Sequence, residues 1–137
     1  MSDRLTKEHR SWNMSRIKSK DTGIEVAVRK RLFSYGYRYR KNDKKLPGKP
    51  DIVFPKFRTV VFIHGCFWHL HPGCKNARIP KSNTEFWQSK LTHNVENDVN
   101  NKHRLEELGW RVITVWECEI EDDLETVIQR IIHELQS

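Results

Sequence analysis

Residues 60–74 of this chain, VVFIHGCFWHLHPGC, join an apolar run to a dense group of side chains that bind metals or transfer protons. Histidine, cysteine and large aromatic residues follow one another there: His64, Cys66, Phe67, Trp68, His69, His71 and Cys74. Packing alone does not explain this composition, because Gly65 and the pair Pro72-Gly73 interrupt any regular element. We therefore expect this segment to bind metal, to carry out chemistry and to contact a ligand.

The cysteines and one histidine have the spacing of a zinc site. Cys66, His71 and Cys74 supply three ligands within one loop, and Cys118, which follows a later apolar run, can return beside them. Three thiolates and one neutral imidazole make a closed tetrahedral site, which indicates a structural zinc ion. An odd number of cysteines without a secretory signal argues against a disulfide framework. The alternative is that the three thiols are buried separately.

Asp51 and the two remaining histidines, His64 and His69, form a second predicted cluster. Asp51 begins one apolar run and His64 ends the next, so antiparallel pairing of two strands brings them close together. A carboxylate, a backbone carbonyl such as that of Ile63, and water suit Mg²⁺. A nearby histidine can activate water or protonate a leaving oxygen, as metal-assisted phosphodiester hydrolysis requires. Otherwise these histidines are packed or surface side chains.

The charge of the chain indicates a polyanionic partner. Its 137 residues carry a formal net charge of +7, with Lys and Arg throughout. This favours nucleic acid over the alternative of a merely basic protein. Residues 1–20 are basic with apolar residues among them, which predicts either a tail docked on the core or an arm around DNA. No signal peptide or membrane span is apparent, so we expect a cytoplasmic protein with no membrane partner.

Hydrophobic periodicity predicts the elements that position these residues. Helices are expected from Asp21 or Thr22 to Gly36, from near Thr84, from about Val95 to Leu108, and from Asp122 to Leu135. Strands are expected at residues 37–40, 51–54, 59–63 and 111–116, the second and third forming a hairpin. This order predicts one α/β (α+β) domain over residues 21–137, a mixed sheet flanked by helices on both faces.

Four stretches closely resemble the very-short-patch-repair (Vsr) mismatch endonucleases: RSWNMSRIKSKDTGIE, LPGKPDIVF, FIHGCFWHLHPGC and TEFWQSKLTHNVENDVNNKHRLEELGWRVITVWEC. The resemblance runs from about Arg10 to Cys118. It implies a variant of the PD-(D/E)XK, restriction-endonuclease-like fold, with a structural zinc loop and a DNA-clasping segment at residues 1–20. It also implies Mg²⁺-dependent nicking of one DNA strand, 5′ to the mispaired T of T·G mismatches that arise when 5-methylcytosine deaminates.

The resemblance implies roles for individual residues as well. Asp51 matches the magnesium-binding aspartate, and His69 matches the histidine of general acid–base catalysis. His64 and Glu25 match supporting active-site residues, and the four predicted zinc ligands match those of the family. The residues that match DNA-contacting positions are Met14 from the minor groove, Phe67, Trp68 and Trp87 from the major groove, and Lys90 and Asn94 beside the mismatched pair. A T·G wobble is easier to wedge apart than a proper pair, and stacking recovers about 1–3 kcal/mol per base.

The chain departs from the family pattern at two places. Ile63 stands where a threonine is frequent, which matters if that hydroxyl holds a metal-bound water. The pair Pro72-Gly73 separates the histidine and the second cysteine of the zinc loop, which can move the loop.

Two rival functions stay open at this point. A restriction-type nuclease of the same superfamily would share Asp51 but cut both strands of matched DNA, usually as a symmetric dimer. A non-catalytic, zinc-stabilised DNA-binding module would need the four zinc ligands but neither Asp51 nor His69. We expect a monomer on double-stranded DNA, because the lesion is asymmetric and needs one cut. Other DNA repair factors are further candidate partners.

Overall fold

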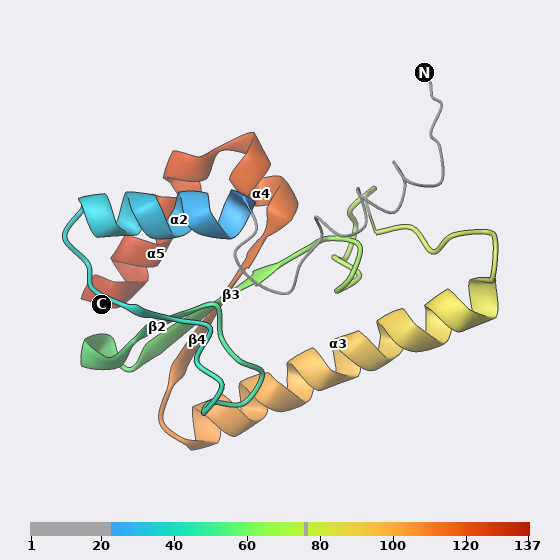
Figure 1. The fold of residues 1–137 in the computed structure, drawn as a ribbon, viewed down its shortest axis with the longest axis horizontal. Coiled ribbons are helices and arrows are strands. Elements are labelled where there is room, and N and C mark those ends of the chain that lie inside the picture. The colour runs from blue at the N-terminus through green and yellow to red at the C-terminus, as the bar shows by residue number, and fades with distance from the viewer. Residues whose placement is uncertain (1–22, 76) are drawn as a thin grey trace.

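Figure 1 shows the fold in a computed structural model, which describes residues 23–75 and 77–137. The predicted N-terminal segment at residues 1–20, with Met14, lies outside the described residues, as does the predicted N-cap at Asp21 or Thr22. The elements are α2 (Gly23–Ser34), β1 (Arg40–Lys41), β2 (Ile52–Phe54), the short 3-10 helix η1 (Pro55–Phe57), β3 (Thr59–His64), α3 (Thr84–Glu107), β4 (Arg111–Trp116), α4 (Glu117–Asp122) and α5 (Leu124–Gln136).

Four strands form one mixed sheet in the order β1-β2-β3-β4. The predicted hairpin of β2 and β3 is confirmed, with Ile52 paired to Val61 in antiparallel register. β3 and β4 are parallel, and α3 connects them, as a parallel pair requires a long crossover. Because parallel strands end at the same edge, His64 pairs with Trp116, and the segments that follow both strands begin side by side.

Helices cover both faces of the sheet, as predicted. α2, α4 and α5 lie on one face and α3 lies on the other (Figure 1). Alternate strand residues supply the two cores, because successive side chains of a strand point to opposite faces. Ile52, Phe54 and Val61 belong to the larger core under α2 and α5. Val53 and Val60 pack with Leu105 of α3 in the smaller one.

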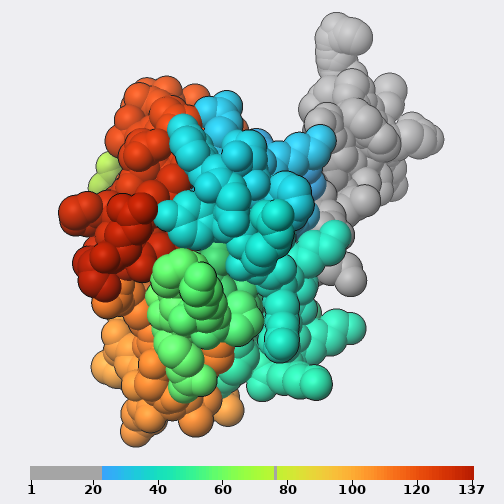
Figure 2. All heavy atoms as spheres, turned by 90° about the vertical axis from the view of Figure 1, so that its left-hand side faces the viewer, coloured from blue at the N-terminus to red at the C-terminus, as the bar shows by residue number. Residues whose placement is uncertain are grey.

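Two helix ends follow from local chemistry. α2 ends before Gly36, whose φ of 93° lies in the left-handed region that glycine adopts without strain. α5 begins after Asp123, whose side chain accepts a hydrogen bond from the Thr126 backbone N–H. The apolar face of α5 is buried as its helical spacing predicts, and its buried residues are Val127, Ile128, Ile131, Ile132 and Leu135. In Figure 2, α2 and α5 pack side by side above the turn between β2 and β3.

The structure corrects three sequence-based element predictions. The two helices expected after residue 84 are the single helix α3, since no glycine or proline separates them. The strand expected at residues 37–40 is reduced to β1, because the rings of Tyr37 and Tyr39 instead pack edge-on against Phe54, each at 6.3 Å. The strand at residues 111–116 was expected to be buried, whereas β4 is buried only at Ile113 and Val115.

The short helix α4 was not expected, because six residues are too few to show helical periodicity. Within residues 23–75 and 77–137, no helix is both long and apolar enough to cross a membrane.

Candidate functional site

A cleft of about 1120 Å³ runs between the ends of β3 and β4 and one side of α3. The segment that follows β3 forms another wall. Predicted site residues line this cleft: Glu25, Asp51, Ile63, His64, Phe67, Trp68, His69, Lys90 and Asn94. Residues far apart in the sequence thus share one surface. Among the described residues, Trp87 and the four predicted zinc ligands lie outside the cleft lining.

Asp51 lies almost fully buried near Glu25 of α2, which is buried as well. The backbone N–H of Ile63 donates a hydrogen bond of 2.6 Å to Asp51 Oδ2. Burial, followed by the hydrogen bond with Glu25, raises the pKa of Asp51 to about 9, although the Ile63 N–H and Arg29 oppose the change. Two adjacent buried carboxyl groups resist simultaneous ionisation. A divalent cation would relieve this repulsion, so the donor set fits a hard metal ion.

His64 and His69 stack face to face, with ring centroids 3.8 Å apart and planes 6° from parallel. Burial, followed by the neighbouring His69, lowers the pKa of His64 to about 4, although Asp98 acts in the opposite direction. His64 is therefore neutral near pH 7. Its Nδ1 atom is buried without a hydrogen-bond partner among the described residues.

Asp98 of α3 is a site residue that sequence analysis does not identify. Its Oδ2 lies 2.6 Å from His69 Nδ1, and its Oδ1 lies 4.0 Å from His64 Nε2. The available signal was helical spacing: Asp98 follows Asn94 by four residues, as Asn94 follows Lys90, so the three share one helix face. The pair of His69 and Asp98 can hold and move a proton.

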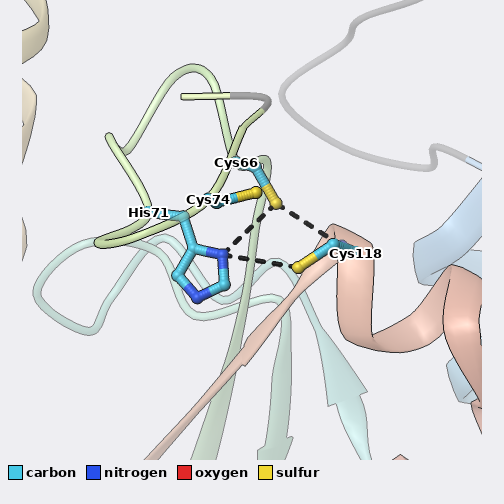
Figure 3. Close-up of side chains that lie close together, drawn as sticks. All are labelled: Cys66, His71, Cys74 and Cys118. Carbon is cyan, nitrogen blue, oxygen red and sulfur yellow. Dashed lines mark hydrogen bonds between the residues drawn. The ribbon is translucent and has the colours of Figure 1, made fainter. Parts of the chain in front are cut away.

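The four predicted zinc ligands point toward one another beside the end of the sheet (Figure 3). The possible ligand atoms of Cys66, His71, Cys74 and Cys118 all lie within 4.8 Å of one another. His71 Nδ1 is 3.6 Å from the Cys66 sulfur and 3.4 Å from the Cys118 sulfur. The His71 ring stacks on Trp116 at 4.1 Å, which orients it.

Parallel pairing of β3 and β4 explains how this cluster forms. Cys66 and Cys118 each follow the end of a strand by two residues, and the Cys118 backbone N–H lies 3.4 Å from the Cys66 sulfur as a donor. Burial raises the pKa of the Cys66 thiol to about 12, so the thiol keeps its proton unless a cation replaces it. Three sulfurs and one imidazole at this separation fit a tetrahedral zinc ion.

Three aromatic side chains gather near the N-terminal end of α3. They are Phe67, Trp68 and Trp87, and we call them the aromatic group. Ring centroids are 5.0 Å apart for Phe67 and Trp68, and 5.4 Å apart for Phe67 and Trp87. All three are only partly buried. Asn94 donates a hydrogen bond of 3.0 Å to the Trp68 carbonyl, which ties the loop to α3. Lys90 is exposed nearby on the cleft.

Comparisons with known proteins identify the family. Residues 2–76 match the family described as DNA mismatch endonuclease Vsr. A type II nicking enzyme of Neisseria meningitidis serogroup A is 56% identical over 122 residues, which are 89% of this chain and 86% of that protein. The DNA mismatch endonuclease Vsr of Escherichia coli K12 is 47% identical over 118 residues, 86% of this chain and 75% of its own. The chain therefore belongs to the Vsr family and is a DNA endonuclease of the Vsr type.

Proposed function

We propose that this protein nicks one strand of double-stranded DNA at T·G mismatches, 5′ to the mispaired T, in very short patch repair. The observation that carries the proposal is one cleft in which a buried acid pair and a histidine–aspartate pair lie beside partly exposed aromatic rings. Hydrolytic groups alone would suit many nucleases. Here, aromatic rings that can stack on bases lie next to the hydrolytic groups. This combination suits an enzyme that opens a weak base pair before it cuts.

Asp51 and the backbone carbonyl of Ile63 are the proposed ligands for Mg²⁺. In an extended strand the N–H and C=O of one residue point to the same side. Since the Ile63 N–H donates to Asp51, its carbonyl is directed toward the same region. Glu25 would add a second carboxylate that orients water. When bound, the cation would polarise the phosphate and stabilise the charge that develops during hydrolysis.

His69 is the proposed proton carrier, and Asp98 is the residue that positions it. A carboxylate that accepts a hydrogen bond from Nδ1–H leaves Nε2 free to take a proton from water. The 2.6 Å contact between His69 and Asp98 supports that arrangement. His64 has a pKa far below neutrality, so we assign it no proton transfer near pH 7 and give it the role of supporting the His69 ring by stacking.

The aromatic group is proposed to insert beside the mismatch from the major groove, with Lys90 and Asn94 near the mispaired bases. Met14 and the basic segment at residues 1–20 would clasp the DNA from the minor groove. A T·G wobble pairs and stacks less well than a proper pair, so inserting rings there costs less than elsewhere. The difference in cost supplies discrimination without many base-specific hydrogen bonds.

We infer a structural rather than catalytic role for zinc at Cys66, His71, Cys74 and Cys118, because four protein ligands leave no open coordination position. We also propose that residues 21–137 form a restriction-endonuclease-like domain and that the protein acts as a monomer that makes one cut. The mixed sheet covered by helices on both faces supports that fold assignment.

Strand-specific nicking of labelled duplexes tests the function. Each duplex carries one T·G pair or the matched T·A or C·G pair, with Mg²⁺ or with EDTA. We expect one cut, on the T strand, next to the mismatch, and only with Mg²⁺. Cleavage of both strands of matched DNA would support the restriction-type reading instead.

The substitution Asp51→Ala separates an enzyme from a binding module. We expect it to abolish nicking while mismatch binding and zinc content stay unchanged. Asp122→Ala, at an exposed carboxylate away from the cleft, is the matched control. Nicking that survives Asp51→Ala would remove Asp51 from the mechanism. Tight mismatch binding without cleavage by the unaltered protein would favour the binding module and make Ile63 the first residue to substitute.

A further inference from the structure

Two exposed lysines line the cleft at positions that the proposed chemistry does not use. Lys49 lies in the loop before β2, and Lys102 lies on α3 one helical turn after Asp98. With a rise of about 1.5 Å per residue, Trp87 lies about 16 Å before Asp98 along α3 and Lys102 about 6 Å after it. Trp87, in the aromatic group, and Lys102 therefore lie on opposite sides of Asp98 along α3.

The loop that carries Lys49 is held against α3. A Cβ atom added at Gly48 would come within 2.9 Å of Asn101 Nδ2, so the loop backbone lies close to the Asn101 side chain of α3. Leu46 packs against the smaller core, and its carbonyl accepts a hydrogen bond from the Lys49 N–H at 3.1 Å. This part of the loop is therefore a fixed feature of the cleft wall, although other parts of the loop before β2 project from the surface (Figure 2).

Lys49 itself has an unusual backbone conformation. Its φ is 48°, in the left-handed region, which is strained for a residue with a side chain. Glycine would adopt this conformation without strain. Strained residues persist where the surroundings require them, and they cluster at ligand-binding sites. Neither the Lys49 nor the Lys102 ammonium group is engaged in an ion pair with another described residue.

We infer that Lys49 and Lys102 form a phosphate-binding pair, which holds the cleaved DNA strand on the side of the cut away from the mismatch. The inference rests on the proposed function. We place the cleaved strand along α3. Successive nucleotides rise about 3.4 Å along B-DNA, so Lys102, about 6 Å from Asp98, would lie one or two nucleotides beyond the cut. Two ammonium groups there would contact phosphate oxygens by charge-assisted hydrogen bonds.

This pair would give the enzyme a second anchor. The aromatic group would hold the mismatch on one side of His69 and Asp98, and the lysine pair would hold the backbone on the other. A strand fixed at both sides presents its scissile phosphate in a restricted position, which favours attack. Contacts to phosphate carry no sequence information, so this anchor would work for any bases beyond the cut.

Salt dependence of DNA binding tests the pair. Lys49→Gln and Lys102→Gln are each expected to lower the slope of log K against log salt concentration by about 0.9, and the double variant by about twice that. Lys44→Gln, in the same loop, and Arg104→Gln, on the same helix, remove equal charge outside the cleft lining and are expected to leave the slope unchanged. Equal effects of all four substitutions would reduce the inference to general electrostatic attraction and overturn it.

Neutral methylphosphonate linkages locate the contact. Placed singly at each phosphate around the cut, they are expected to weaken binding of the wild-type protein roughly tenfold at one or two positions beyond the cut. The double variant is expected to show no such loss there. A loss of the same size in the double variant would overturn the inference, as would a wild-type protein sensitive only on the mismatch side.

Lys49→Gly separates binding from folding, because it removes the charge and also the left-handed strain. We expect it to melt no lower than the wild type and yet to lose the contact. The experiment with methylphosphonate linkages measures binding at the phosphates around the cut, on whichever duplex the enzyme cleaves. If matched DNA is cut instead of T·G duplexes, the proposed function fails while the lysine pair is still tested at that cut.

Discussion

The substitution Asp98→Asn tests the proposed mechanism most directly. Asparagine has the shape of aspartate but no charge, and its amide can donate to His69 Nδ1. The variant would lose the charged acceptor that now lies 2.6 Å from Nδ1, and its amide N–H facing Nδ1 would favour the tautomer whose Nε2 carries hydrogen. A base with its proton on the wrong nitrogen cannot take one from water. We expect slower cleavage with unchanged DNA affinity.

The expected size of the effect follows from the contact. A hydrogen bond to a charged group contributes about 1.5–3 kcal/mol, and the lower part of this range applies because the His69 and Asp98 side chains are 27% and 26% exposed. About 1.5–2 kcal/mol less transition-state stabilisation, at 1.36 kcal/mol for each tenfold change, slows the chemical step about 10- to 30-fold.

Single-turnover nicking of a T·G duplex with enzyme in excess measures the chemical step, and binding in EDTA measures the affinity. Glu106→Gln removes an exposed carboxylate from the same helix outside the cleft and is the control. A cleavage rate of Asp98→Asn within twofold of the wild type would refute the proposed role of Asp98. A rate that falls only in proportion to lost binding or lost zinc would refute it as well.

Three further predictions concern stability. Asp51→Asn is expected to raise the Tm of metal-free protein at pH 8, because the buried Asp51 carboxyl, with a pKa of about 9, must gain a proton on folding there. Melting curves in EDTA should show this gain in Tm shrinking as the pH is lowered toward 4. A gain in Tm that does not depend on pH would contradict this expectation. Asp123→Ala is expected to lower Tm by a few degrees at pH 7 by removing the N-cap of α5. Hydrogen bonds from Thr126 lower the pKa of Asp123, so urea unfolding should show this contribution vanishing as the pH falls through that lowered pKa. Asp123→Asn should retain most of it at pH 7. Cys118→Ser is expected to reduce zinc content below one ion per chain and Tm by roughly 10 °C, and undiminished zinc would count against a four-ligand site.

Sequence patterns predicted the elements best where hydrophobic periodicity was strong. α5 has apolar residues at helical spacing throughout, and Arg111–Trp116 is a strand with the predicted bounds. The single helix α3 was divided in the prediction because its sequence is mostly polar, which leaves little periodicity to follow. α4 and the short β1 depend on packing against other elements, which a local pattern does not record.

For the candidate site, the residue types were informative where their chemistry is rare. Three cysteines and a nearby histidine indicated a zinc cluster without any knowledge of the fold. Asp98 was missed because an aspartate on a polar helix has no distinguishing local feature. Only the placement of α3 beside the segment after β3 brings its carboxylate to His69.

The sequence by itself determined the family, the order of most elements and the gathering of possible metal-ligand side chains in residues 64–74. Those properties are encoded locally, in side-chain types, short spacings and hydrophobic period. The tertiary structure alone decided that β3 and β4 run in parallel, so that Cys66 meets Cys118, and that Asp98 and Lys102 share a cleft with Asp51. Burial then decided the charges, since the raised pKa of Asp51 and the lowered pKa of His64 both arise first from the loss of water around them.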